Sequence, residues 1–214
     1  KAKKGPLNNI TVIDLTRVLA GPYATMILSD LGARIIKVEP PNGDDSREFS
    51  PFVKNQSAYF ASLNREKESI KLDLKDTEDK LIFNNLLKQA DILIENYKPG
   101  TMEKLGYGFN YLKNKFPNLI YASCSGFGQT GPWSKKPAYD MIVQGMGGLM
   151  SVTGYENQEP VRVGTSIGDI AAGLFTTIGI LSALLDRHNN NKGQSIDVSM
   201  LDCQIAILEN AIAR

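Results

Sequence analysis

The 214-residue chain has one histidine, two cysteines and almost no net charge. The histidine, His188, lies in the polar run DRHNNNKG, which is typical of a solvated loop, so histidine-dependent triads and zinc sites are excluded within this chain. Cys124 and Cys203 are far apart and have no partner spacing, which argues against a disulfide or metal framework. A formal charge of +1 gives no reason to expect nucleic acid or an anionic membrane as a partner.

Long apolar runs are also lacking. No uninterrupted apolar segment approaches the roughly 18 residues of a membrane span, and no signal-peptide pattern opens the chain. We therefore expect a cytoplasmic protein without a membrane partner. The composition, 42% hydrophobic and 22% charged, is ordinary for a soluble globular protein with one large domain or two small ones.

Strand and helix patterns alternate along the chain. Buried strands are predicted at residues 10–15, 33–38, 69–74, 90–95, 119–125 and 195–198. Helices are predicted at 24–31, 77–89, 101–105, 110–115, 140–149 and 200–213, with a loop at 40–55. Pro22 and Gly32 bound the first helix, while Thr77 caps the second, with Leu81, Leu86 and Leu87 on its apolar face. This alternation predicts an α/β fold with a Rossmann-like parallel sheet and flanking helices.

The segment 164–185, GTSIGDIAAGLFTTIGILSALL, has one carboxylate, Asp169, in an otherwise uncharged run. Apolar residues recur at helical spacing, which predicts a helix whose core-facing stripe is Ile170, Leu174, Ile178, Leu181 and Leu185. Asp169 is thereby placed at or just inside the helix N-terminus. It is either an N-cap or a nucleophile that the helix dipole keeps ionised, with Gly168 allowing close approach of a substrate. Spacing leaves both alternatives open.

Three loops bear on ligand binding. The turn after the first strand, TRVLAGPYA, lacks the G-x-G-x-x-G glycines, so dinucleotide binding is not favoured. The turn from Asn96 to Gly100 follows a strand, at the end where α/β sheets usually bind ligands. The segment GFGQTGPWSKKPAYD combines glycines with Phe127, Trp133 and Tyr139, which is typical of an ordered functional loop.

Seven segments, in this order, carry a specific resemblance: DLTRVLAGPYA, LSDLGARIIKVEPPNGDDSR, SIKLDLK, ENYKPGTMEKLG, CSGFGQTGP, AYDMIVQGMGGLMSVTG and VGTSIGDIAAG. Together they resemble the CaiB/BaiF family, the class III CoA-transferases, whose members are roughly twice as long. The resemblance implies that residues 1–198 form the N-terminal part of a Rossmann-like large domain. It also implies that residues 199–214 form a helix leading to a remainder that would complete an interlocked homodimer.

The resemblance implies a chemistry as well. The family nucleophile is an aspartate in a Gly-Asp segment that opens a helix, which corresponds here to Asp169, with Tyr139 and Asp140 as further catalytic candidates. Asp169 would attack an acyl-CoA thioester and form first an anhydride and then an aspartyl-CoA thioester, before CoA passes to a carboxylic acid. Acyl-CoA and a small carboxylic acid are then substrates, and no permanently bound cofactor or metal is expected.

Coenzyme A contacts also transfer by resemblance. They fall on five short segments that include three lysines suited to CoA phosphates: Leu19 and Ala20; Leu72, Asp73, Leu74 and Lys75; Asn96, Tyr97 and Lys98; Lys104; and Pro137, Ala138, Tyr139 and Asp140. Taken one at a time, each lysine is equally consistent with a solvated surface charge.

Two departures and two alternatives accompany the resemblance. Leu19 replaces the glutamine of some formate- and oxalate-handling members, and Pro40 replaces a basic residue, so the residues do not favour oxalyl or formyl specificity. A 2-methylacyl-CoA racemase of the same family would have a histidine where this chain has Tyr139, which removes the second proton carrier. The other alternative is an inactive CoA-binding fragment.

Overall fold

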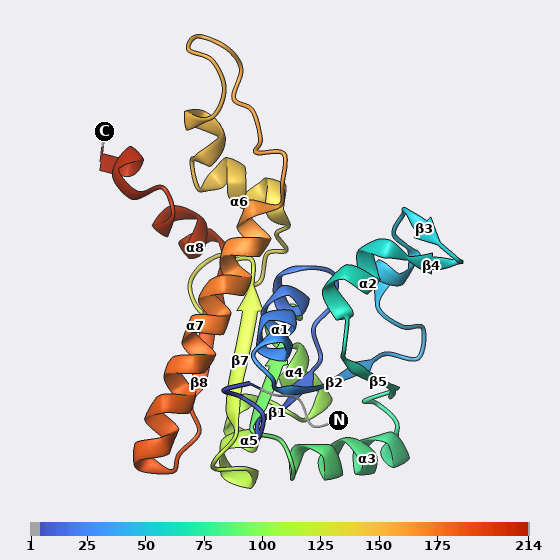
Figure 1. The fold of residues 1–214 in the computed structure, drawn as a ribbon. Helices are drawn as coiled ribbons and strands as arrows, with labels where there is room; N and C mark the ends of the chain where they lie inside the picture. The colour runs from blue at the N-terminus through green and yellow to red at the C-terminus, as the bar shows by residue number, and fades with distance from the viewer. Residues whose placement is uncertain (1–4, 214) are drawn as a thin grey trace.

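The structure, a computed structural model, describes residues 5–213. Six parallel strands form one sheet in the order β5-β2-β1-β6-β7-β8 (Figure 1). These strands are β1 (Thr11–Asp14), β2 (Arg34–Glu39), β5 (Glu68–Lys71), β6 (Ile92–Glu95), β7 (Ile120–Ser125) and β8 (Ser195–Ser199). The chain moves outward from β1 in one direction and then returns to build the other half from β6. The direction of winding therefore reverses between β1 and β6, which confirms the Rossmann-like prediction.

Helices cover both faces of the sheet. On one face lie α1 (Ala20–Asp30) and α7 (Ile167–Asn190), while α3 (Thr77–Leu87), α4 (Thr101–Leu105) and α5 (Phe109–Lys115) cover the other. Two further helices, α6 (Asp140–Met146) and α8 (Met200–Ala206), pack against α7 beyond the carboxyl ends of the strands (Figure 1).

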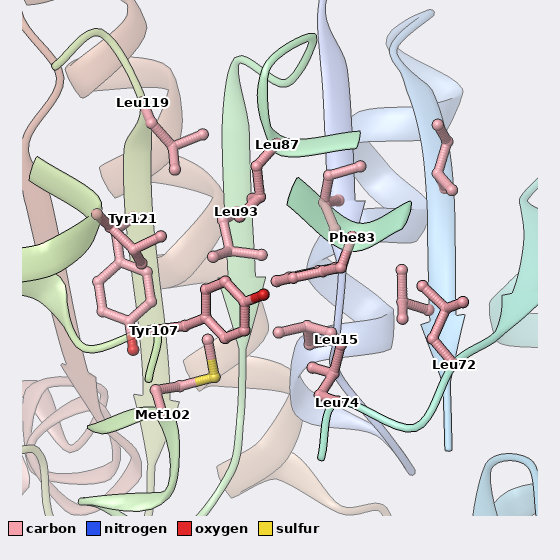
Figure 2. Close-up of a cluster of buried hydrophobic side chains, with 14 residues drawn as sticks. Leu15, Leu72, Leu74, Phe83, Leu87, Leu93, Met102, Tyr107, Leu119 and Tyr121 are labelled. Carbon is pink, nitrogen blue, oxygen red and sulfur yellow. The ribbon is translucent and has the colours of Figure 1, made fainter. Parts of the chain in front are cut away.

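Alternate residues of the strands supply two separate cores because successive side chains point to opposite faces. Ile13 and Leu93 face α3 to α5 and belong to one cluster with Phe83 and Tyr107. Figure 2 shows Leu93, Phe83 and Tyr107 in this cluster. Val12 and Ile92 face the other way, toward α1 and α7. The strands therefore read as nearly continuous apolar runs, as is expected for a parallel sheet buried on both faces.

The predicted core-facing stripe of α7 is wrong for most of its length, although one member, Leu181, is partly buried against the core. Leu174, Ile178 and Leu185 are 45%, 58% and 70% exposed, whereas the buried face is built mainly from small residues: Gly168, Ala171, Ala172, Gly173, Thr176, Thr177, Ile180 and Ala183. Gly173 shows the reason, since an added Cβ would lie 2.8 Å from the carbonyl oxygen of Ala20 in α1. Small side chains let α7 lie close to α1, and the larger apolar residues are left on the opposite face.

The α7 helix also qualifies the expectation about membrane spans. By length and composition this helix could cross a bilayer, but 44% of its most apolar 18-residue segment is buried inside the protein. That buried part lies against α1, β7 and α8, which is the arrangement of a core helix in an α/β domain.

Several local predictions need correction. Asp76, and not Thr77, caps α3 by accepting from the N–H groups of Glu78 and Asp79, and Leu81 is 62% exposed. The segment predicted as a loop at 40–55 contains a short helix, η1 (Asp45–Glu48), and the strand β3 (Phe52–Val53). Directly after it come β4 (Gln56–Ser57), which forms a hairpin with β3, and α2 (Ala58–Asn64), and none of these elements was predicted.

The helices near the C-terminal end are shorter than predicted. The helix expected at 140–149 ends at Met146 and is followed by η2 (Leu149–Val152). The helix expected at 200–213 is interrupted after Ala206, and η3 (Glu209–Ala213) follows; Arg214 lies outside the described residues.

Candidate active site

A cavity of about 170 Å³ opens where the winding of the sheet reverses. The loops that follow β1, β6 and β7 line it, together with the end of β7, η1 and the first turns of α1, α7 and α8. The lining residues are Arg17, Val18, Leu19, Ala20, Asp45, Asn96, Tyr97, Lys98, Pro99, Cys124, Ser125, Gly126, Lys136, Pro137, Ala138, Tyr139, Asp169 and Met200. This position, outside the carboxyl ends of parallel strands at a switch point, is where open α/β sheets bind ligands.

Asp169 is the third residue of α7, so the prediction that it lies just inside the helix is confirmed and its reading as an N-cap is wrong. The N-cap residue, Ser166, makes no side-chain cap bond. The carboxylate of Asp140, on α6, accepts the N–H of Gly168 at 2.8 Å instead. A side chain from another helix therefore caps α7, and the carboxylate of Asp169 is left to line the cavity.

The glycine before Asp169 has a different use from the one predicted. An added Cβ at Gly168 would lie 2.6 Å from Cγ2 of Val143 and 3.1 Å from Oδ1 of Asp140. Gly168 thus allows α6 and α7 to approach each other, and it is not among the residues that line the cavity.

The electrostatics of Asp169 also differ from the prediction of a dipole-ionised carboxylate. Burial raises the pKa of Asp169, the negative charge of Asp140 raises it further, and a backbone hydrogen bond from Ala20 opposes them, leaving a pKa of about 7. A carboxylate with this pKa is about half ionised at neutral pH and is a stronger base than an ordinary aspartate. Burial and a like charge outweigh the helix dipole here.

Asp140 is buried, and both of its carboxylate oxygens accept hydrogen bonds from the protein. Its second oxygen accepts the side-chain amide of Gln144 at 2.8 Å, and the carbonyl oxygen of Gln144 accepts the N–H of Val163 at 2.9 Å. Asp140 therefore holds the start of α7 and acts on Asp169 through its charge. Tyr139, next to it, is 74% exposed at the wall of the cavity.

Three cationic side chains line the cavity: Arg17, Lys98 and Lys136. The guanidinium of Arg17 lies 3.0 Å from a carboxylate oxygen of Asp45. The ammonium of Lys136 lies 5.2 Å from the centre of the Trp133 ring, whose other neighbour is Phe127 at 5.6 Å. These cations are suited to an anionic substrate.

Glu95, the last residue of β6, holds the turn that follows this strand. This buried carboxylate accepts the N–H of Tyr97 at 2.7 Å and the hydroxyl of Tyr121 at 3.0 Å, and burial raises its pKa to about 7. The amide of Asn96 is also occupied, since it accepts the N–H of Arg17 at 2.9 Å and donates to the carbonyl of Arg17 at 2.8 Å. Asn96 therefore joins the loops after β1 and β6.

The structure brings together just over half of the predicted site residues. Those that line the cavity are Leu19, Ala20, Asn96, Tyr97, Lys98, Pro137, Ala138, Tyr139 and Asp169. Those that do not are Leu72, Asp73, Leu74, Lys75, Lys104 and Asp140. Leu72 and Leu74 have their side chains in the core, as Figure 2 shows, so only their backbone can reach a ligand. The exposed Lys75 and Lys104 can meet only parts of a ligand that extend beyond the cavity.

Other lining residues were not predicted, notably Arg17, Lys136, Cys124 and Met200. Arg17 lies two residues before the predicted Leu19, and Lys136 directly precedes Pro137, so a wider window around each predicted loop finds both. Cys124 is near the carboxyl end of β7 and Met200 opens α8, and no sequence pattern marks either residue.

Comparisons with known proteins agree with this architecture. The chain is 53% identical over 211 residues to an acetyl-CoA:oxalate CoA-transferase of Acetobacter aceti, which covers 98% of this chain and 54% of the relative. It is 45% identical to a succinyl-CoA:glutarate CoA-transferase of Mus musculus, over 97% of this chain and 48% of the relative. The chain thus spans about half the length of the curated relatives that it matches.

Among solved structures, a CaiB/BaiF family protein from Brucella suis superposes with a TM-score of 0.95 at 42% identity, over 99% of this chain and 57% of that protein. The family model described as CoA-transferase family III matches residues 7–214, which is nearly the whole sequence. The reversal of winding in the sheet, the aspartate in the first turn of α7 and these matches lead to one conclusion: the chain belongs to the class III CoA-transferase family.

Proposed function

We propose that the protein containing this chain moves CoA from an acyl-CoA donor to a carboxylic acid, with Asp169 as the nucleophile. One observation carries the proposal: the only carboxylate in the uncharged first half of α7 faces a cavity bordered by cations at the switch point of the sheet. Its pKa of about 7 supports the same role, because a more basic carboxylate is a better nucleophile while still ionising near neutral pH.

In the proposed reaction, an oxygen of Asp169 attacks the thioester carbonyl carbon, and CoA leaves as a thiolate. The thiolate then attacks the aspartyl carbonyl of the resulting mixed anhydride, which releases the donor acid and forms an aspartyl-CoA thioester. The acceptor carboxylate attacks this thioester and again releases CoA thiolate. Attack of the thiolate on the acyl carbonyl of the new anhydride yields the new acyl-CoA and restores Asp169.

The cavity is suited to the reacting end of the substrate. Its volume of about 170 Å³ is below the roughly 300–1,000 Å³ of a site that encloses a whole small molecule. It therefore accommodates the acyl group and thioester, while the nucleotide end of CoA lies outside. Arg17, Lys98 and Lys136 are available to phosphates or to a carboxylate of the acid.

The names of the relatives suggest the substrates. Acetyl-CoA:oxalate and succinyl-CoA:glutarate CoA-transferases both hand CoA to a dicarboxylic acid, so we propose a small dicarboxylate as acceptor. Leu19 does not favour oxalate, but the 53% identity to the oxalate enzyme keeps oxalate among the acids to test. We further propose a homodimer acting in the cytoplasm, which sedimentation and cell fractionation would test.

The decisive experiment is mass spectrometry of the purified natural protein after incubation with a panel of acyl-CoA esters. We expect a CoA or acyl adduct on the peptide that contains Asp169 and transfer to one or more acids of the panel. Asp169→Ala should form no adduct and show no transfer, while it remains folded. CoA transfer by this variant near the native rate would refute the assignment of Asp169 as the nucleophile.

A second measurement distinguishes the racemase alternative. The native protein is incubated with a 2-methylacyl-CoA in D₂O, and α-proton exchange is followed by mass spectrometry. We expect no exchange above the uncatalysed rate, because His188 lines a groove at the opposite end of α7 from Asp169. Rapid exchange would favour the racemase.

A further inference from the structure

The segment Thr16–Ala20, here called the 16–20 turn, connects β1 to α1 and forms one wall of the cavity. Its last residue, Ala20, lines the same cavity as Asp169 and packs against α7, since a Cβ added at Gly173 would lie 2.8 Å from the Ala20 carbonyl oxygen. The backbone N–H of Ala20 lowers the pKa of the Asp169 carboxyl. Val18, within the turn, has a positive φ of 65°. That conformation is strongly disfavoured for a β-branched residue, so the surrounding structure must hold the turn in place.

A buried ion pair supplies much of that restraint. The side chains of Lys37, on β2, and Asp44 are each 1% exposed, and Nζ of Lys37 lies 2.8 Å from Oδ2 of Asp44. The same ammonium donates to the carbonyl oxygen of Thr16 at 2.6 Å. The other oxygen of Asp44 accepts the N–H of Val18 at 3.2 Å. Each partner of the pair therefore holds one backbone group of the turn.

A second buried group holds the same region from the other side. Asp14 accepts the N–H and hydroxyl of Thr16 and the hydroxyl of Thr25. Lys67, whose pKa burial lowers to about 8, lies 3.3 Å from Asp14 and donates to Thr25 and to the carbonyl of Pro22 in α1. The turn and the first residues of α1 are thus anchored as one unit.

Stability alone does not account for so many buried charges. Taking two ions out of water costs free energy that their mutual attraction often does no more than offset, so a buried pair is weak evidence for a stabilising role. What Lys37 and Asp44 have in common is the turn that they hold, and this turn ends at Ala20, against Asp169.

We infer that Lys37 and Asp44 are positioning residues of the active site, which hold the 16–20 turn and so keep the backbone of Ala20 beside Asp169 in the wall of the cavity. The inference rests on the proposed nucleophilic role of Asp169. Removing the pair should free the turn, move the N–H of Ala20 away from Asp169 and make the carboxylate harder to ionise.

The test is the titration of Asp169 in the purified natural protein, measured without any activity assay. The free energy of unfolding of Asp169→Asn is compared with that of the native protein across pH 4–9, because the pH at which their difference levels off reports the folded-state pKa of Asp169. The same pair of measurements is made in the Lys37→Met/Asp44→Asn background, which leaves no unpaired charge. We expect the level-off point to rise by about 0.5–1 pH unit, because the N–H of Ala20, which favours the ionised carboxylate, would move away from it.

Several other groups contribute to the field at Asp169 and stay unchanged in this comparison. They are Asp140 on α6, Tyr59 on α2, Cys124 on β7, and the cations at the cavity, Arg17, Lys98 and Lys136. Both the native and the double-variant backgrounds contain these groups. A difference between the two Asp169 titration curves therefore comes from the change in the 16–20 turn.

Leu87→Ala is the matched control. Leu87, the last residue of α3, is buried in the core on the opposite face of the sheet from α7, so its truncation should cost stability without moving the titration. Thr16→Val is a milder second variant, because it removes only the hydroxyl bond to Asp14 and should move the titration in the same direction by less. An unchanged titration in both the double variant and Thr16→Val would overturn the inference.

Activity then separates this inference from the proposed function. If the native protein transfers CoA, the pH midpoint of kcat should rise in the double variant as the titration does, with kcat at pH 7 about two- to fivefold lower. If the native protein transfers nothing but the titration still moves, the proposed function fails and the positioning of Asp169 stands. If the native protein transfers CoA but the double variant changes neither the titration of Asp169 nor the pH midpoint of kcat, the positioning role of Lys37 and Asp44 is refuted and the proposed function stands.

Discussion

Replacing Asp169 with asparagine should make the protein more stable at pH 8. The pKa of Asp169 is about 7 in the folded protein against an ordinary value of 3.8, so folding favours the protonated carboxyl. Above pH 7 the folded state must bury a charge that the unfolded chain leaves in water. At about 1.4 kcal/mol per pH unit this difference corresponds to about 4 kcal/mol, and solvent at the mouth of the cavity screens part of it. We therefore expect a gain of about 2–4 kcal/mol.

The direction of the pKa shift of Asp169 determines how the free energy of unfolding depends on pH. A raised folded-state pKa means that the contribution of Asp169 to stability is fully present below about pH 4 and is lost as the pH rises toward 7. Asparagine has no such titration, and its side-chain oxygen can still accept the Ala20 bond. The difference between the variant and the native protein should therefore be small near pH 4, grow up to pH 7 and remain constant above it.

Urea denaturation at several pH values, followed by circular dichroism, measures this difference. Asp186→Asn is the matched control, because Asp186 lies on the same helix but is exposed, so the loss of its charge relieves no desolvation. A variant that is no more stable than the native protein at pH 8 would refute the argument that the carboxylate of Asp169 is held in a desolvated site.

Three further predictions follow from single contacts. Lys98→Ala should raise KM several-fold for every CoA ester and change kcat less, and the effect should shrink with added salt; an unchanged KM would remove Lys98 from the site. Gly168→Ala should lower the free energy of unfolding by about 1–3 kcal/mol, measured in urea, since the new methyl would lie 2.6 Å from Val143. Arg47→Ala should cost about 1–3 kcal/mol at pH 7 and little at pH 2. Burial raises the pKa of its partner Glu39, but hydrogen bonds from Arg47, Ser69 and the Asp44 backbone outweigh burial and hold that pKa at about 2. The stabilisation is therefore present above pH 4.5 and lost as the pH falls toward 2. Equal costs of the substitution at pH 7 and pH 2 would contradict this.

The sequence by itself determined the six strands of the parallel sheet, the main helices between them and the position of the nucleophile candidate. Apolar runs such as ILIE and IYASCS predict strands because a parallel sheet buries both faces, and the β-α-β order of the segments implies parallel neighbours. Asp169 stands out in sequence because it is the single charge in a long apolar segment.

Only the tertiary structure decided which face of α7 is buried. Periodicity detects the largest apolar residues, and here they lie outward, because the close approach of α7 to α1 requires Gly173 and its small neighbours. The same applies to the cap of α7, which comes from Asp140 on another helix, 28 residues earlier in the chain.

The environment of the nucleophile candidate was likewise beyond the sequence. A pKa depends on burial and on charges brought close in space, and neither Asp140 beside Asp169 nor the Lys37–Asp44 pair under the 16–20 turn has a sequence signature. Local patterns therefore locate the residue that can react, whereas contacts between segments far apart in the chain set its charge and hold it in position.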